Sequence, residues 1–181
     1  MSSSAARIEI WEAIARDAIA ESPLWSDALK PEGERRDEPV FSPLAEERFA
    51  LGLETIYEGY LVHYGESRLF DPADDDSALL LGDYLYAHGL VRVAGLREVD
   101  AVADLSELIS LCSQLRAEAA DGDGPLWAAT AALLGAGHEL DEPRAALRFR
   151  GDPSGLERAA RAARGDEQVE RALAAHTGRV R

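Results

Sequence analysis

The sequence predicts an all-α fold, a helical bundle formed by one chain of 181 residues. Apolar residues recur at helical spacing in several segments, and these segments are bounded by Ser, Asp, Gly or Pro. No segment of adequate length shows the alternation of apolar and polar residues that is typical of a β-strand. No repeat of fixed period is present. We therefore expect helices that bury their apolar faces against one another.

The chain is strongly acidic, with a formal net charge of -15. This charge argues against a nucleic-acid partner, because phosphate binding requires a basic surface. The single cysteine, Cys112, allows no internal disulfide, and we expect a cytoplasmic protein. Charged residues near the start, such as Glu9 and Glu12, argue against a secretory signal peptide. The longest apolar run, 128–137, is about half the ~20 residues of a membrane span, so we expect none.

The charge is unevenly distributed along the chain. Residues 141–181 contain nine arginines against seven acidic residues, a net charge of +2, which leaves -17 on residues 1–140. Such a segment could dock on its own acidic body, on an acidic partner or on a phosphorylated ligand. A solvated helical surface is the simpler interpretation.

We divide the chain into three parts: 1–41, 42–140 and 141–181. In the first part, apolar residues at helical spacing predict an amphipathic helix over 6–21, which ends at Ser22-Pro23. Prolines and glycine in 24–41 predict an exposed connection with at most a short helical turn.

The central part begins with a helix that we expect to run from Ser42-Pro43 to His63 and to carry one broad apolar face. After a connection over 64–76, a helix over 77–94 is expected, capped by Asp76 or Ser77 and stopped by Gly95. Its apolar residues cover most of the helical circumference, which predicts a core helix packed on several sides. These residues are Leu79, Leu80, Leu81, Leu85, Leu90, Val91 and Val93.

Further helices are expected over 97–120 and 126–135, separated by a break at 121–125. Cys112 falls on the apolar side of the first and is interpreted as a small core residue. The third part predicts short surface helices, over 144–150, 154–163 and 167–176.

Three of these segments, 49–63, 79–87 and 126–136, resemble in order and spacing the central helices of the trans-isoprenyl diphosphate synthase (polyprenyl synthetase) family. The first is similar to the family's helix that ends in Leu-Ile-His-Asp-Asp, and the second, Leu-Leu-Leu-Gly-Asp-Tyr-Leu-Tyr-Ala, to its Leu-Ala-Gly-Asp-Tyr-Leu-Leu-Ala segment. The third is similar to the alanine-rich helix that follows a Lys-Thr pair. The resemblance covers about half of the chain and implies a truncated isoprenoid synthase fold.

In that family, aspartate-rich motifs hold Mg²⁺, which binds a diphosphate and helps it to leave; the hard cation requires carboxylates. Here Tyr64-Gly65 stands where the first two aspartates are expected, Arg68 replaces a pair of arginines, and Asp123-Gly124 replaces Lys-Thr. No second Asp-Asp-x-x-Asp follows. The resemblance therefore implies a protein similar to the non-catalytic small subunits of heteromeric prenyl diphosphate synthases.

Three residues are candidate ligand-binding residues, and none is assigned as catalytic or as a metal ligand. The resemblance places Asp83 beside the family's central cavity; alternatively it is a buried carboxylate tied to a hydroxyl or an arginine. His63 ends an apolar helix and is more simply a structural histidine. Gln114 occupies roughly the place of a polar residue of the family. The acidic run Asp74 to Asp76 is interpreted as helix capping rather than as a metal site.

Three functional hypotheses follow. The first is a catalytically silent partner or regulatory subunit in isoprenoid diphosphate biosynthesis, bound to a motif-complete prenyl synthase or to itself, with a possible isoprenoid chain as ligand. The second is a stand-alone helical binding or scaffold protein. The third is a divergent enzyme, the only hypothesis that requires a cofactor, Mg²⁺.

Overall fold

The computed structural model describes residues 2–180, and it gives side chains from Ile10 onward. Within this range the predicted all-α fold is confirmed: nine α-helices are present, and the only β contacts are two isolated bridges. The helices are α1 (Ser2–Glu21), α2 (Pro23–Asp27), α3 (Ala50–Tyr64), α4 (Asp75–Ala94), α5 (Val99–Ala117), α6 (Asp123–Ala132), α7 (Asp141–Arg150), α8 (Ser154–Arg164) and α9 (Asp166–Thr177).

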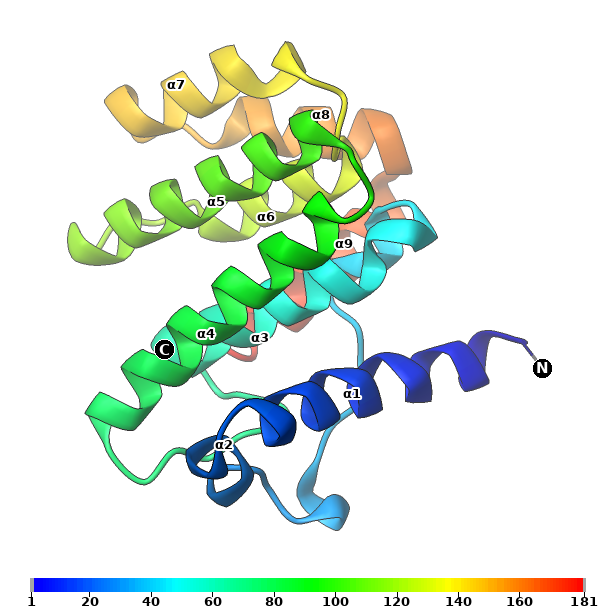
Figure 1. Cartoon of the computed structure of the whole chain (residues 1–181). Coiled ribbons are helices and arrows are strands. Elements are labelled where there is room, and N and C mark those ends of the chain that lie inside the picture. Colours follow the sequence, from blue (N-terminus) through cyan, green and yellow to red (C-terminus); the bar gives the residue numbers. More distant parts are fainter. Residues whose placement is uncertain (1, 181) are drawn as a thin grey trace.

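An antiparallel pair, α3 and α4, runs through the middle of the molecule (Figure 1). Helix α1 lies on one side of this pair, and α5 to α8 lie on the other. Every residue of α3 from Gly52 to Leu61 is buried. The helix surrounded on all sides is therefore α3.

Glycines let α3 and α4 approach closely. Gly52 and Gly59 on α3, and Gly82 and Gly89 on α4, are each seven residues apart, about two helical turns. A Cβ on Gly89 would lie 2.4 Å from the Ile56 Cγ1 and 2.9 Å from the Gly52 carbonyl oxygen. The contact is backbone against backbone at both ends of the pair, which fixes the register of the two helices.

Two hydrophobic clusters lie on the two sides of this pair. The smaller one joins α1 and α2 to α4 and to the loop before it, through residues such as Trp11, Trp25, Phe70 and Leu85. The larger one lies among α3, α5, α6, α8 and α9 and contains Trp127. Cys112 is buried in it, as expected for a small core residue.

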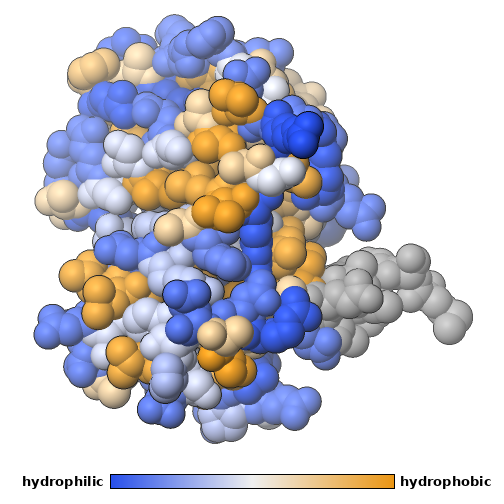
Figure 2. Space-filling model, viewed as in Figure 1, coloured by the Kyte–Doolittle hydropathy of each residue, from blue (hydrophilic) through white to orange (hydrophobic). Residues whose placement is uncertain are grey.

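The expectation that α4 is packed on several sides is wrong. Leu81, Leu85 and Val93 are buried, but Leu80 is 56% exposed and Val91 is 67% exposed. The pattern misleads because α4 packs along its whole length only on α3. Helix α5 and the cluster with α1 and α2 cover other parts of it, and the side toward the viewer in Figure 1 is uncovered. Figure 2 shows apolar surface gathered along α4 and the adjacent side of α5.

Several boundaries also differ from expectation. Asp74, not Asp76 or Ser77, caps α4: its Oδ1 accepts from the Ser77 amide at 2.7 Å. Helix α3 begins at Ala50, after two 3-10 turns, Ser42–Leu44 and Glu47–Phe49. The helix does not start at Ser42 because the backbone is extended at Ala45 and Glu46, with ψ of 173° and 144°.

The C-terminal helices are more than surface helices. Leu156 and Ala160 of α8 and Val169 of α9 are fully buried and belong to the larger cluster. The sequence underestimates them because alanines and charged residues occupy most of the remaining positions, which makes the stripe of large apolar residues narrow.

Candidate functional site

The structure brings two of the three candidate residues together. His63 is in the last turn of α3, and Asp83 lies opposite on α4, because Gly59 and Gly82 set the two helices in this register. The His63 Nε2 and the Asp83 Oδ1 are 3.3 Å apart. The Asp83 side chain is 66% exposed, so the interpretation of a buried carboxylate is wrong: the buried leucines nearest to it, Leu81 and Leu85, face the smaller hydrophobic cluster instead.

The His63 ring is held by close packing. It fills the space above Gly82, where an added Cβ would lie 2.3 Å from the Nε2, and it contacts the rings of Tyr64 and Tyr86. Burial lowers the pKa of His63 and outweighs the Asp83 carboxylate, which raises it. The Nε2 makes no geometrically sound hydrogen bond, and neither does the buried Tyr86 hydroxyl.

Gln114 is engaged elsewhere. It lies near the end of α5, where its side-chain amide donates to Glu118 Oε1 at 3.0 Å on the exposed side of the helix. The contact links two residues one turn apart, as is common on a helix surface. It gives Gln114 a local structural role.

The acidic run before α4 does not join this pair. Asp74 is the N-cap of α4, and the hydrogen bond that its carboxylate accepts from the Ser77 amide lowers its pKa. Asp75 and Asp76 are exposed in the first turn. Asp83 follows two turns later. Among the side chains that the structure describes, those of residues 10–180, no group of three His, Cys, Asp or Glu is arranged to hold a metal ion.

A buried ionic cluster around Arg68 is the main feature that sequence reasoning missed. Arg68 and its two partners on α3, Glu54 and Glu58, are all fully buried. The guanidinium donates to Glu58 Oε2 at 2.8 Å and to Glu54 Oε2 at 2.7 Å. It also lies against the rings of Trp11 and Tyr57, at 4.3 and 5.0 Å from their centroids.

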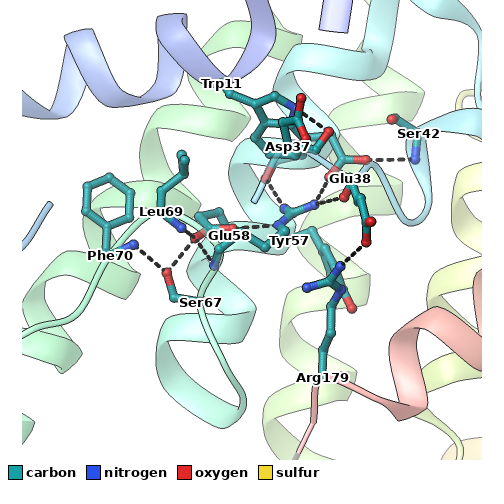
Figure 3. Close-up of polar contacts among 12 residues, drawn as sticks. Trp11, Asp37, Glu38, Ser42, Tyr57, Glu58, Ser67, Leu69, Phe70 and Arg179 are labelled. Carbon is teal, nitrogen blue, oxygen red and sulfur yellow. Dashed lines mark hydrogen bonds and ion pairs between the residues drawn. The ribbon is translucent and has the colours of Figure 1, made fainter. Parts of the chain in front are cut away.

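The cluster ties three chain segments to α3 (Figure 3). Glu58 Oε1 accepts from the Ser67 hydroxyl and from the amides of Arg68 and Leu69, which fixes the loop between α3 and α4. Arg68 also donates to the Glu38 carbonyl oxygen, and the Glu38 side chain accepts from Arg179 near the C-terminus. One guanidinium thus pairs with two carboxylates inside the protein, and the Ser67 hydroxyl and backbone amides satisfy the second oxygen of Glu58, which is the arrangement of a structural clamp.

A second cluster joins α3, α5, α6 and α9 around Asp123. Its Oδ2 accepts from the Tyr60 hydroxyl and from Arg116, and lies 3.3 Å from the His176 Nε2. Since a carboxylate only accepts, the His176 Nε2 carries a proton in this contact, and the His176 Nδ1 lies 3.0 Å from the Tyr57 hydroxyl oxygen. Burial raises the pKa of Asp123, but hydrogen bonds from His176 and Tyr60 and the charge of Arg116 lower it well below its usual range.

This second cluster lies beside an open hollow. The hollow has a volume of about 610 Å³ and is lined by Tyr64, Ser113, Arg116 and Asp121, among others. Tyr57 is fully buried and His176 is 3% exposed, so only the Arg116 side of the cluster meets the hollow. The cluster therefore offers no accessible nucleophile or base.

A third buried pair lies between α5 and α7. Arg144 donates to Asp104 Oδ1 at 2.9 Å, and the second oxygen of Asp104 accepts from the Gly135 amide at 3.0 Å. Both side chains line a hollow of about 400 Å³, which His138 also borders. Here too the charges are paired within the protein.

No family model, curated protein or solved structure matches this chain. Within the part that the structure describes, no helix is long and apolar enough to cross a membrane.

Proposed function

We propose that this chain is a catalytically silent helical subunit, similar to a shortened prenyl diphosphate synthase, which acts by binding a motif-complete synthase. One observation carries the proposal. Where the resemblance requires the first two aspartates of a metal-binding motif, the chain has Tyr64 and Gly65, and the described side chains contain no group of three His, Cys, Asp or Glu residues that could hold a metal ion.

The remaining chemistry supports this silence. Mg²⁺ bound to a diphosphate needs carboxylates with free oxygens facing a cavity. Glu54, Glu58 and Asp123 instead accept from arginines, hydroxyls and backbone amides, and they hold the helices together. Because these buried acidic side chains already accept hydrogen bonds within the protein, we expect the chain to act through its surface, by binding a partner.

The exposed surface supports a partner. Large apolar side chains that are 55 to 79% exposed lie on α4 and at the start of α5. These are Leu79, Leu80, Val91 and Val99. Exposed apolar side chains that lie on neighbouring elements are typical of interaction sites. The single, buried Cys112 fits the reducing cytoplasm in which we place the protein.

Co-purification tests the proposal. A motif-complete prenyl diphosphate synthase from the same genome is co-expressed with this chain, and the complex is sought by size-exclusion chromatography. We expect a complex, and we expect the synthase to change its activity or product length. A synthase that neither binds the chain nor changes its products would contradict the proposal.

Two further measurements separate the other hypotheses. An empty protein that binds no synthase, shown by mass spectrometry of native protein and extracted lipid, would favour a stand-alone scaffold. Magnesium-dependent diphosphate release from geranyl or farnesyl diphosphate, lost in Asp83→Asn, would favour a divergent enzyme.

A further inference from the structure

We propose that the hollow between α5 and α7 binds a small organic cation, a guanidinium or ammonium compound that also carries a neutral oxygen acceptor. The hollow has a volume of about 400 Å³, which is within the usual range for small-ligand sites. Helix α7 lies beside α5, on the side of the molecule away from α1 and α2 (Figure 1). Neither His63 nor Asp83 lines the hollow, so the inference goes beyond the proposed function and does not depend on it.

Two ion pairs, one turn apart, bridge the helices along this hollow. Arg144 of α7 donates to Asp104 of α5 at 2.9 Å, and Arg148 of α7 donates to Glu107 of α5 at 2.7 Å. The residue numbers of the partners rise together, so the two helices run in the same direction here. The position one turn closer to the N-terminus of α5 therefore lies opposite the position one turn closer to the N-terminus of α7.

Both of these positions hold acids, Asp100 and Asp141, and both line the hollow. Asp100 has no hydrogen bond or ion pair with any residue that the structure describes. The Asp141 carboxylate pairs with His138, whose side chain is 96% exposed. Acids in a first turn are favoured by the helix dipole, which accounts for each residue singly. Two carboxylates that line one hollow, where the neighbouring positions are acid–arginine pairs, form a place for a positive charge.

An unpaired buried donor at the same hollow is a second, independent observation. Arg144 lines the hollow and is only 5% exposed. Its Nη1 donates to Asp104 and its Nη2 to the Thr130 hydroxyl, but its Nε has no partner among the described residues. Buried polar groups are almost always hydrogen-bonded, so this donor requires an acceptor. A neutral acceptor fits best, because Asp104 and Glu107 would repel an anion.

An organic cation fits this hollow better than a metal ion. Among the side chains of residues 10–180, no three His, Cys, Asp or Glu are arranged to coordinate a metal. A guanidinium or ammonium group carries several donors, so it can serve two carboxylates at once without a fixed coordination geometry. Ala103 and Ala145 also line the hollow and offer apolar contact to the carbon chain between the cation and the acceptor.

NMR titration of the ¹⁵N-labelled full chain with 4-guanidinobutanamide tests the site. We expect saturable shifts at the amides of the hollow, with a dissociation constant of about 1 mM or lower. 4-Ureidobutanamide has the same shape but no charge, so it should not bind. Butylguanidine has the cation but no amide, and it should bind about threefold or more weakly, because the Arg144 Nε stays unpaired.

Three variants locate the cation. Asp100→Asn and Asp141→Asn should each raise the dissociation constant of 4-guanidinobutanamide about tenfold or more, because each removes one charged acceptor. Both residues are exposed, so circular dichroism should stay unchanged. Glu142→Gln is the matched control: it removes the same charge from the first turn of α7, but Glu142 does not line the hollow, so the dissociation constant should stay unchanged.

Several results would overturn this inference. One is the absence of saturable binding of 4-guanidinobutanamide, and another is equal binding of the uncharged analogue. A third is a loss of affinity in Glu142→Gln as large as that in Asp100→Asn, which would indicate a general attraction to an acidic protein. Equal affinities for butylguanidine and 4-guanidinobutanamide would refute the role given to Arg144. All of these measurements use the chain alone, so they stand or fall separately from binding to a synthase.

Discussion

Replacing Arg68 by Met should strongly destabilise the protein. The change leaves Glu54 and Glu58, both fully buried, without their cation. Removing one partner of a buried ion pair costs about 3–5 kcal/mol, and here one arginine serves two carboxylates. We therefore expect a loss of about 4 kcal/mol or more in the free energy of unfolding. For a chain of this size, that loss corresponds to a melting temperature lowered by about 8–16 °C.

Urea and thermal unfolding followed by far-UV circular dichroism measure this loss. The matched control is Arg36→Met, whose ion pair with Glu66 is exposed and should be worth less than about 1 kcal/mol. Adding Glu54→Gln and Glu58→Gln to Arg68→Met removes the unpaired charges, and should restore part of the stability. If Arg68→Met were no less stable than Arg36→Met, the cluster would not be the clamp described above.

Three other predictions concern packing and titration. Gly89→Ala should lower the free energy of unfolding, measured by urea titration, by about 1–3 kcal/mol, because the added Cβ would overlap α3. The control Gly33→Ala, which has open space around it, should not lower it. Equal stabilities of the two variants would refute the close contact between α3 and α4. Because the pKa of Asp123 is lower in the folded protein than its unfolded value of 3.8, the ionised carboxylate stabilises the fold fully above pH 3.8, and this stabilisation is lost as the pH falls through the lowered folded-state pKa. Asp123→Asn should therefore be less stable at neutral pH and should lose less stability on acidification. An acid unfolding transition identical to that of the wild type would contradict this role. In NMR titrations His63 should titrate below 6.5, and Asp83→Asn should lower its pKa further because an attracting charge is lost; a rise would show that the pair does not interact.

The order of helices could be predicted because its signals are local. Ser22-Pro23 ends α1, and the spacing of apolar residues marks α5. Which face is covered could not be predicted, because it depends on which helices become neighbours. The leucine run before Asp83 has the same composition whether or not another helix lies over Leu80.

The buried polar clusters around Arg68 and Asp123 could not be predicted for a related reason: their members lie far apart in the sequence. His176 meets Tyr57 across 119 residues, and no local pattern encodes such a pairing. The Arg68 cluster did leave a signal: Glu54 and Glu58 stand four residues apart on an otherwise apolar helix. Two acids on a buried face imply a buried cation, and Arg68 is the nearest arginine that follows them. By contrast, His63 and Asp83 were selected from the family resemblance and lie in contact.

The most direct test of the central claim, that this chain is silent by itself and acts on a synthase, is a product assay on the mixture. The motif-complete synthase is incubated with allylic and isopentenyl diphosphates and Mg²⁺, alone and with this chain, and the prenyl products are separated by length. If the chain is inactive alone and acts on a synthase, the chain alone should release no diphosphate, and the mixture should show an altered rate or an altered distribution of product lengths. Magnesium-dependent turnover by the chain alone, or an identical product distribution with and without it, would contradict the claim.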